Sequence, residues 1–561
     1  MQELNTLLER TDRRAQDRER MVVRSALWAA AGDALGWITE LSHGSENVKR
    51  RSGSAHVSRP VEWMRVIGGR TGPKVDLPAG TYSDDTQLRL AVSRCIRGDG
   101  AFDAEAFAKI ELTVWPTYAL GGGLGTKAAA LSLSRRSTSW FSNFFDSGSQ
   151  QYVKGGGNGA AMRVQPHVWS AKGSALDLVL SVLRDALVTH GHPQGFCGAV
   201  FHALSLHATM TAGAIPPPNE WESFVDTFPE IANIIDRDPQ LTSFWRSAWE
   251  EQSGVSLETA LDHARDEAML DLKKVQKAAK SMEPGEYGSV LEALGCTTQD
   301  FRGAGLKTAI AALVLAYMNR NGSPDAALVQ AANELASDTD TIATMAGALL
   351  GVPAENEPNW HVQDREYIVQ EAKRLADVAC GIARESFSYP DLARWTPPAS
   401  QLASIGCLGD DLAMVGLGLL KPVGKQYRVG DSLWQWCRLP FGQTVLAKRK
   451  SNLEAISVDQ LPGEPFRTAR ATQPSPSVRA SQQSLGFAEE RQLLVPSVPK
   501  QHLEEWSLDS ATNEAIKSDF EDGIVGRLLN QCIEETGSIE RVIAFAAILA
   551  KAKLARQRKR R

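Results

Sequence analysis

Alanine and leucine recur at three- and four-residue spacing from about residue 20 to residue 388, with glycine-rich joints between the periodic segments. This spacing places apolar side chains on one face of an α-helix. Runs of β-branched residues do not alternate with the helical segments, so a parallel sheet is not expected. The pattern therefore predicts a mainly all-α core, with helices that include residues 22–34, 175–188, 304–318 and 364–383. Residues 212–300 begin with three consecutive prolines and continue as charged helices, which suggests an insertion within this core.

The pattern changes after residue 388, and four further segments are predicted around the core. Residues 1–19 form a charged N-terminal extension, and residues 389–461 form a small β-containing module with hairpin turns at Val423-Gly424 and Gly430-Asp431. Residues 462–499 are rich in Pro, Ser, Gln and Arg, a composition that predicts a flexible linker. Residues 500–561 regain a helical period.

The C-terminal segment is predicted to contain two helices. The first presents Ile516, Phe520, Ile524 and Leu528 at four-residue steps, and the second follows a break at Gly537 with Ser538 as its N-cap. The face of the second helix is formed by Ile539, Val542, Ile543, Ala546 and Leu549. Seven lysines and arginines lie between residues 551 and 561. They suit either a solvated helix end or contact with a protein or nucleic-acid partner.

Composition narrows the class of protein. The net charge of −5 gives no global nucleic-acid footprint, and the longest apolar run, residues 309–318, is too short to cross a bilayer. Seven scattered cysteines without a C-x-x-C pair indicate reduced thiols. We therefore expect a cytoplasmic protein with no membrane partner.

Two acidic clusters are candidates for metal binding. Ser83-Asp84-Asp85-Thr86 and Asp338-Thr339-Asp340-Thr341 each place two carboxylates beside hydroxyl groups. Adjacent carboxylates repel each other unless a cation holds them, and Mg²⁺ prefers oxygen ligands. Each cluster alone is more typical of a helix N-cap than of a metal site, but two in one helical unit favour a dinuclear site.

Two glycine-rich segments and a histidine lie between the acidic clusters. Two segments, Gly121-Gly122-Gly123-Leu124-Gly125 and Gly155-Gly156-Gly157-Asn158-Gly159, offer backbone N–H groups to a phosphate-bearing ligand. Taken alone, such segments are more often flexible joints. Neither matches a P-loop. The spacing around Thr189-His190 does not fit zinc, so hydrogen bonding is the more natural role for His190.

Taken in order, these motifs resemble the ADP-ribosylglycohydrolase family over about residues 20–385. The resemblance rests on Gly32-Asp33-Ala34-Leu35-Gly36, Glu40, Ser83-Asp84-Asp85-Thr86, Gly157-Asn158-Gly159-Ala160-Ala161-Met162-Arg163, Thr189-His190 and Asp338-Thr339-Asp340-Thr341-Ile342. It implies an orthogonal helical fold with two Mg²⁺ ions, Mn²⁺ being the other candidate. The implied metal ligands are Ser83, Asp84, Asp85, Asp338, Asp340 and Thr341. The implied ADP-ribose contacts are Gly121, Gly123, Gly155, Gly156, Gly157, Asn158 and His190, with Tyr152 as a stacking partner.

The same resemblance implies a mobile acid/base glutamate at Glu40, for which a salt-bridged surface carboxylate at a helix end is the competing interpretation. The expected function is a Mg²⁺-dependent hydrolase that removes ADP-ribose from a modified protein, nucleic acid or small molecule. The alternative is a non-catalytic ADP-ribose-binding or scaffold protein that acts through its C-terminal region. Two departures from the family pattern are Ser83 in place of threonine and Ala336-Ser337 in place of a glycine pair.

Overall fold

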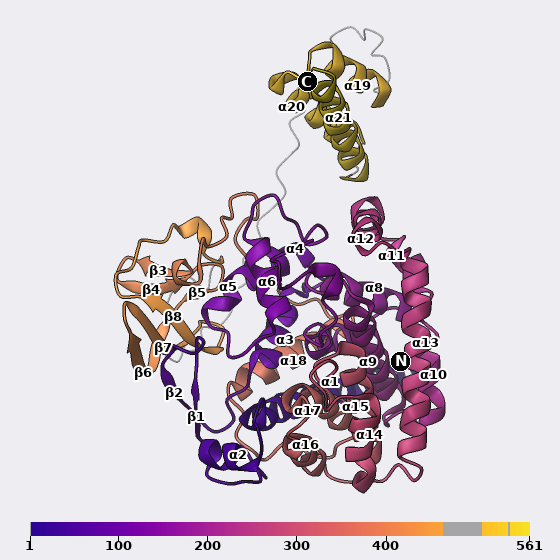
Figure 1. The fold of residues 1–561 in the computed structure, drawn as a ribbon, viewed down its shortest axis with the longest axis vertical. Coiled ribbons are helices and arrows are strands. Elements are labelled where there is room, and N and C mark those ends of the chain that lie inside the picture. The colour runs from indigo at the N-terminus through magenta and orange to yellow at the C-terminus, as the bar shows by residue number, and fades with distance from the viewer. Residues whose placement is uncertain (1, 464–507, 537–538, 561) are drawn as a thin grey trace. The chain divides into compact units, whose positions relative to one another are not determined.

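The computed structural model describes residues 2–463, 508–536 and 539–560. The chain divides into two compact units, one within residues 1–469 and the other within residues 470–561. The first unit is mainly helical and also carries small antiparallel sheets (Figure 1). The prediction of a mainly all-α core followed by a small β-containing module is therefore confirmed.

Helices α1 (Gln2–Thr39) and α17 (Thr339–Gly351) pack along each other at the centre of the first unit. Glycines make this close approach possible. A Cβ at Gly32 would lie 2.3 Å from the Ala343 carbonyl oxygen, and one at Gly347 would lie 2.4 Å from the Trp28 carbonyl oxygen. The packing brings the C-terminal end of α1 beside the N-terminal end of α17, because a Cβ at Gly36 would lie 2.4 Å from the Thr339 carbonyl oxygen.

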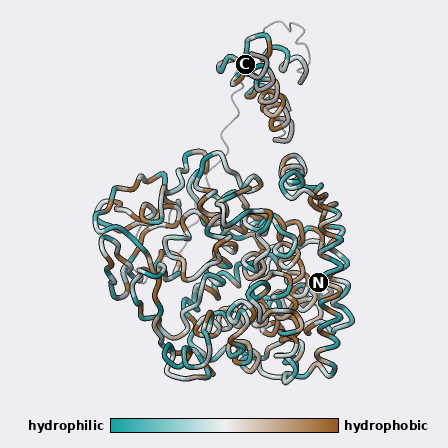
Figure 2. Tube along the Cα trace, viewed as in Figure 1, coloured by the Kyte–Doolittle hydropathy of each residue, from teal (hydrophilic) through white to brown (hydrophobic). Residues whose placement is uncertain are grey.

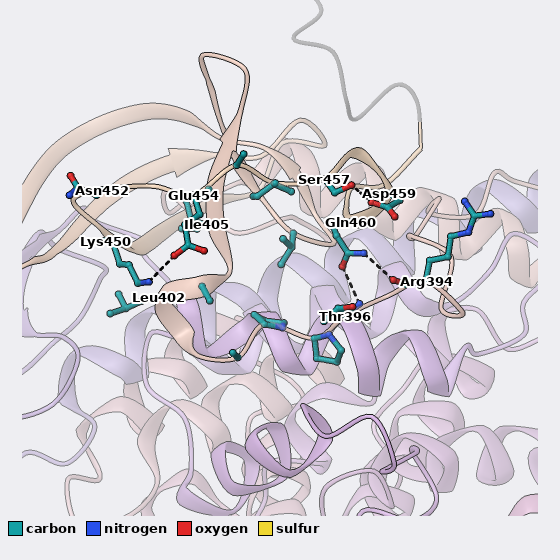
Figure 3. A pocket seen from close by; sticks show the side chains of 18 residues that line it. Arg394, Thr396, Leu402, Ile405, Lys450, Asn452, Glu454, Ser457, Asp459 and Gln460 are labelled. Carbon is teal, nitrogen blue, oxygen red and sulfur yellow. Dashed lines mark hydrogen bonds and ion pairs between the residues drawn. The ribbon is translucent and has the colours of Figure 1, made fainter.

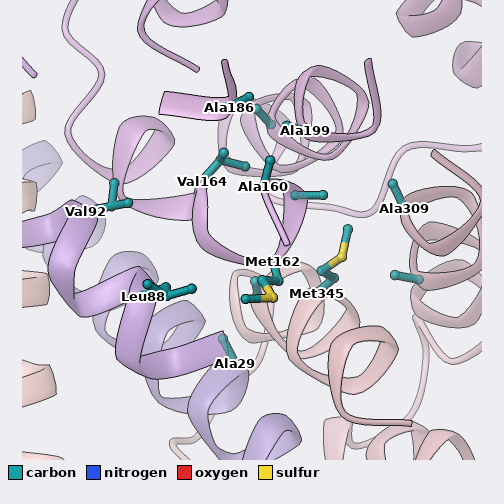
Figure 4. Close-up of a cluster of buried hydrophobic side chains, with 14 of the residues drawn as sticks. Ala29, Leu88, Val92, Ala160, Met162, Val164, Ala186, Ala199, Ala309 and Met345 are labelled. Carbon is teal, nitrogen blue, oxygen red and sulfur yellow. The ribbon is translucent and has the colours of Figure 1, made fainter. Parts of the chain in front are cut away.

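Several other helices of the first unit pack against this pair. Apolar residues (brown in Figure 2) recur along the chain. Leu88 of α3 (Asp84–Cys95) points toward Met162 in one buried cluster, to which Val92 and Met345 also belong (Figure 4). The other helices of the first unit are α2 (Ser45–Ser52), α3 (Asp84–Cys95), α4 (Ala104–Ala106), α5 (Leu112–Val114), α6 (Leu124–Leu133), α7 (Gln165–Trp169), α8 (Ala175–Ala186), α9 (Pro193–Ala212), α10 (Trp221–Val225), α11 (Ile231–Ile235), α12 (Arg246–Ser253), α13 (Leu257–Ala278), α14 (Tyr287–Leu294), α15 (Gly305–Met318), α16 (Pro324–Asn333) and α18 (Arg365–Ala379). Short helical turns are η1 (Phe107–Glu111), η2 (Trp115–Thr117), η3 (Tyr152–Lys154), η4 (Ala161–Arg163), η5 (Pro218–Glu220), η6 (Leu241–Trp245), η7 (Pro284–Glu286), η8 (Gln401–Ala403) and η9 (Val458–Gln460). Across the described residues, none of the helices is both long and apolar enough to span a bilayer.

All strand pairs in the described sheets are antiparallel. Strands β1 (Trp63–Val66) and β2 (Lys74–Leu77) form a hairpin inside the helical region that the sequence pattern did not predict. Two three-stranded sheets follow, with strand orders β3-β4-β5 and β6-β7-β8. Their bounds are β3 (Ile405–Leu408), β4 (Asp411–Met414), β5 (Gly418–Leu419), β6 (Lys421–Val429), β7 (Ser432–Arg438) and β8 (Thr444–Lys450).

One of the two predicted hairpin turns is confirmed and the other is wrong. Gly430-Asp431 joins β6 to β7, because Val429 pairs with Ser432 and Gly430 has a φ of 56°. Val423-Gly424 instead lies within β6, where the register shifts between Pro422 and Gln426. A Cβ at Gly424 would lie 3.0 Å from the Cβ of Trp436, so this glycine permits close packing between strands and does not reverse the chain.

The second unit consists of α19 (Leu508–Lys517), α20 (Asp522–Thr536) and α21 (Ile539–Arg560). Ile516, Phe520, Ile524 and Leu528 do not share one helix as predicted, because Phe520 lies between α19 and α20 with a φ of 60°. On α21, Phe545 is buried and the predicted face residue Ala546 is exposed.

Three earlier predictions concern this end of the chain. The predicted break at Gly537 and N-cap at Ser538 lie outside the described residues, as does the predicted linker beyond residue 463. In the basic tail, the Nζ of Lys553 is 3.9 Å from an Asp522 carboxylate oxygen, and Arg556 forms a 3.3 Å ion pair with Asp519. Lys553 and Arg556 therefore form ion pairs with carboxylates of the second unit.

Candidate functional site

A cavity of about 1120 Å³ opens where the C-terminal end of α1 meets the N-terminal ends of α3 and α17. Carboxylates lie in this cavity together with both glycine-rich segments. The predicted site residues that line it are Glu40, Asp84, Asp85, Gly121, Gly123, Gly155, Gly156, Gly157, Asn158, His190, Asp338, Asp340 and Thr341. Ser83 and Tyr152 are not among the lining residues.

The first acidic cluster forms the start of α3. Ser83 is the N-cap, and its hydroxyl oxygen accepts a 3.2 Å hydrogen bond from the Asp85 backbone N–H. The buried carboxylate of Asp33 on α1 accepts hydrogen bonds from the Ser83 N–H and the Thr86 N–H, both at 2.9 Å. It also accepts a 2.6 Å bond from the Thr86 hydroxyl. Asp33 therefore fixes the backbone that presents Asp84 and Asp85.

The second acidic cluster forms the start of α17, with Asp338 at the N-cap position. The Asn158 side-chain amide donates a 2.7 Å hydrogen bond to Asp338. The hydroxyl of Thr341 lies 3.5 Å from Asp85 Oδ1, so the two clusters meet across the cavity. The first cluster caps its helix through Ser83, whereas Asp338 occupies the N-cap position of α17 without a side-chain capping hydrogen bond. Both clusters place carboxylates in the cavity wall.

Glu40 directly follows α1 and joins the second cluster. Carboxylate oxygens of Glu40, Asp338 and Asp340 all lie within 4.8 Å of one another. The guanidinium of Arg65, on β1, donates a 2.9 Å hydrogen bond to Glu40 Oε2 and lies 5.3 Å from the Trp37 ring centroid. Glu40 is thus salt-bridged, as the competing interpretation expected, but it is salt-bridged inside the cavity.

The carboxylates disfavour one another's charge. Burial, together with Glu40 and Asp33, raises the pKa of Asp84 to about 7. Burial and then neighbouring carboxylates raise the pKa values of Asp85 and Asp340 well above their ordinary range. Negative charge concentrated in this way is stabilised by a bound cation.

The donor atoms fit a hard divalent cation. Asp85 Oδ2 is buried and has no hydrogen-bond partner in the described part of the chain, and the surrounding donors are carboxylate and hydroxyl oxygens. Such an oxygen set suits Mg²⁺ or Mn²⁺ and does not suit a metal that prefers sulfur. Asp84, Asp85, Asp338, Asp340, Thr341 and Glu40 are placed to hold a metal, whereas the Ser83 hydroxyl is engaged in capping α3.

The glycine segments are anchored and do not act as loose joints. Gly121 has a φ of 118°, and a Cβ there would lie 2.4 Å from Asp84 Oδ1, so this position admits only glycine without displacement. The second segment is tied to the start of α15, because the Asn158 N–H donates to the Gly303 carbonyl at 2.9 Å. The Gly305 N–H donates to the Gly156 carbonyl at 2.9 Å. These backbones therefore form fixed walls of the cavity.

His190 presents a neutral ring to the cavity. Burial, with the nearby Arg163, lowers the pKa of His190 to about 3. Arg163 donates a 2.9 Å hydrogen bond to the Thr189 hydroxyl, which lies 2.7 Å from His190 Nδ1. The Nε2 atom of the ring faces Gly157 and Gly159 of the glycine wall.

Tyr152 lies behind the glycine wall, away from the cavity. Its hydroxyl donates to the Leu187 carbonyl at 2.6 Å and accepts from the Trp245 indole N–H at 2.7 Å. The ring packs against Phe144 at 4.8 Å. In this position the tyrosine supports the loop and is not placed to stack on a ligand in the cavity.

Several residues of the site were not predicted from the sequence. Asp33 stood in a motif that carried the family resemblance, but it was given no role. Nothing in the sequence pointed to Arg65, nor to Trp434 and Lys448 of the β-module, which also line the cavity. A separate cavity of about 490 Å³ lies beside β3, where Gln460 bonds to the backbone of Arg394 and Thr396 (Figure 3). Its polar groups bond mainly to one another, and it lacks a cluster of carboxylates like that of the larger cavity.

The fold and the cavity define a helical protein with a carboxylate-rich, glycine-walled site. The chain belongs to the ADP-ribosylglycohydrolase family, whose model matches residues 13–381. The family resemblance that the sequence motifs suggested is therefore confirmed.

Two characterised relatives are similar to this chain over part of its length. An ADP-ribosyl-[dinitrogen reductase] glycohydrolase of Rhodospirillum rubrum is 27% identical over 170 residues, which is 30% of this chain and 50% of that protein. The ADP-ribosylhydrolase ARH3 of Danio rerio is 25% identical over 284 residues, which is 48% of this chain and 69% of that protein. The chain thus spans about half of the first relative's length.

A solved structure described as an "ADP-ribosylglycohydrolase-related protein complex" aligns with 65% of this chain and 99% of its own. The sequence identity is 19% and the TM-score is 0.39.

Proposed function

We propose that this protein is a Mg²⁺-dependent ADP-ribosylglycohydrolase that removes ADP-ribose from a modified protein, nucleic acid or small molecule. The observation that carries the proposal is the convergence of Asp84, Asp85, Asp338 and Asp340 with Glu40 in one glycine-walled cavity. Membership of the ADP-ribosylglycohydrolase family supports it. A cytoplasmic location and Mn²⁺ as the alternative ion are proposed with it.

Each wall of the cavity contributes to substrate binding. The backbones of Gly121 and of residues 155–157 permit close approach of a pyrophosphate. The tautomer that serves this site has Nδ1 of His190 accepting from the Thr189 hydroxyl and Nε2–H donating to an oxygen of the ligand. A metal ion held by the aspartates and Thr341 would bind the ribose hydroxyls and offset the negative charge of the carboxylates.

Glu40 is the proposed proton-transfer group. Hydrolysis breaks the bond between the anomeric carbon and the acceptor atom while a water oxygen bonds to that carbon. The water loses one proton, and the departing acceptor atom gains one. Glu40 can carry out either transfer, and Arg65 holds its carboxylate toward the cavity through a 2.9 Å hydrogen bond.

Measuring ADP-ribose release from defined linkages tests the proposal. We expect wild-type protein with Mg²⁺ to release free ADP-ribose from at least one of arginine-linked, serine-linked or phosphate-linked substrates. Glu40→Gln should lower kcat by about 100-fold or more, the range for loss of a general acid or base. The matched control is Glu46→Gln, at an exposed glutamate on α2. Equal rates for the two variants would contradict the role of Glu40, and binding without release from any linkage would favour a non-catalytic ADP-ribose-binding protein.

A further inference from the structure

The β-module forms part of the wall of the candidate site, although it lies outside the residues that match the family model. The model match ends at residue 381, whereas Trp434 on β7 and Leu446 and Lys448 on β8 line the cavity. Trp434 pairs directly with Lys448 in the sheet, so the two side chains share one face. The family match therefore does not cover the residues of this wall.

The β-module wall, defined by Trp434, Leu446 and Lys448, reaches the cavity next to the β1–β2 hairpin. A Cβ at Gly68 in that hairpin would lie 3.0 Å from Cζ2 of Trp434. Arg65 lies on β1 three residues before Gly68, and its guanidinium bonds to Glu40. The β-module wall therefore adjoins the hairpin whose Arg65 bonds to Glu40, the proposed proton-transfer group.

The position of the β-module wall beside the β1–β2 hairpin indicates which part of a substrate it faces. The inference rests on the proposed function, in which Glu40 exchanges a proton with the departing acceptor or with the attacking water. The glycine segments and His190 take the ADP-ribose portion. The acceptor that carries the ADP-ribose therefore lies toward Glu40, the β1–β2 hairpin and the β-module wall.

Lys448 gives this wall a positive charge. Its Nζ lies 5.0 Å from the centroid of the Trp434 ring, a cation–π contact that keeps the ammonium at the cavity wall. Its side chain is half-buried, and no carboxylate of the described residues forms an ion pair with it. A cation in this setting favours an anionic group on the acceptor.

The sheet around Lys448 also carries an excess of positive charge. Residues 421–450 contain seven lysines and arginines and a single acidic residue, Asp431, although the whole chain has a net charge of −5. Within the described residues, two of these seven cations form ion pairs with carboxylates: Lys425 with Asp76 and Lys450 with Glu454. The β1–β2 hairpin, residues 63–77, adds three cations and one acidic residue. A predominantly positive surface suits a polyanion better than it suits a protein surface, which ordinarily carries both signs.

We propose that the acceptor is a nucleic-acid strand, and that Lys448 contacts a phosphate of that strand beside the site of modification. For ADP-ribose on a terminal phosphate, the bond between the anomeric carbon and the phosphate oxygen breaks. A water oxygen bonds to the anomeric carbon, and the freed phosphate accounts for the remaining proton. Lys448 acts by binding and positioning the strand and takes no part in proton transfer.

Two substrates and three variants test this proposal. The substrates are a DNA oligonucleotide with ADP-ribose on a terminal phosphate and a peptide with ADP-ribosyl-arginine. We expect Lys448→Met to lower the ratio of kcat/KM on the oligonucleotide to that on the peptide about tenfold, mainly through KM. Lys448→Arg keeps the charge and should retain most of the ratio. The matched control is Lys373→Met, at a lysine on α18 outside the cavity.

Salt dependence provides a second measurement. The oligonucleotide KM of wild-type protein should rise steeply with salt, and Lys448→Met should reduce the slope of log KM against log salt by about 0.7–0.9, the value for one phosphate contact. Equal losses on both substrates, or release from the peptide alone, would overturn the nucleic-acid proposal and leave the proposed hydrolase function standing. Release from neither substrate, nor from any other linkage, would overturn the hydrolase function itself.

Discussion

Replacing Gly121 by alanine tests how the glycine wall and the first acidic cluster depend on each other. Gly121 has a φ of 118°, a backbone conformation that costs a residue with a Cβ about 1–3 kcal/mol. The new Cβ would also lie 2.4 Å from Asp84 Oδ1, which is shorter than a van der Waals contact. Either the carboxylate or the loop must shift, and a displacement of about 1 Å at a reacting site can lower the rate about 100-fold.

Gly123→Ala is the matched comparison. Gly123 has a φ of −62°, and a Cβ there would meet no atom within 4 Å. We expect its free energy of unfolding to stay within about 1 kcal/mol of the wild-type value and its rate of ADP-ribose release to fall less than about tenfold. Urea unfolding and release kinetics in Mg²⁺ measure both effects. If Gly121→Ala and Gly123→Ala lost the same activity and stability, the close contact between Gly121 and Asp84 would not matter to the site.

Three further changes have defined outcomes. Asp33→Asn should lower the free energy of unfolding, measured by urea titration, by about 2–4 kcal/mol, because one buried N–H loses its acceptor. The control Asp146→Asn, at an exposed turn, should lower it by about 0.5 kcal/mol or less. Arg65→Met should lower kcat/KM for ADP-ribose release about tenfold, since Glu40 loses the ion pair that orients it, and an unchanged value would make that pair incidental. Burial lowers the pKa of His202 to about 3 in the folded chain, against an ordinary value of 6.5, so the unfolded chain binds the extra proton between these pH values. The contribution of His202 to stability should therefore fall by up to about 1.4 kcal/mol per pH unit as pH drops through this window. Unfolding titrations of wild type and His202→Gln at several pH values should show that the variant lacks this contribution.

The sequence identified the two acidic clusters that the structure brings into one cavity, but it did not identify the residues that hold them in place. Asp84, Asp85, Asp338 and Asp340 could be paired because adjacent acidic residues next to apolar helices are a local pattern. The bonds from Asp33 to the start of α3 join residues about 50 positions apart, and a single aspartate within an alanine-rich helix carries no local signal. The same limit explains Tyr152, for which the family resemblance implied a stacking role. Its hydroxyl bonds to Leu187 and Trp245 hold the side chain in the core.

The β-structure shows a related limit. The β1–β2 hairpin is two four-residue strands within a helical region, too short for an alternating pattern to stand out. The sequence predicts a turn at Gly424 because glycine is common in turns. The reason for a glycine within the strand is the close approach of Trp436 on the neighbouring strand. The contact between Trp434 and Gly68 joins positions more than 350 residues apart, so composition could not reveal that the β-module reaches the site.

The most direct test of the central claim is the Mg²⁺ dependence of ADP-ribose release when one carboxylate of the cavity is removed. Protein is stripped of metal with a chelator, and Mg²⁺ is titrated back into wild type, Asp340→Asn and the control Asp266→Asn, an exposed aspartate on α13. The account predicts saturable activation of wild type and Asp266→Asn, and a loss of about 100-fold or more in Asp340→Asn. Full activity without Mg²⁺, or an Asp340→Asn variant as active as wild type, would contradict it.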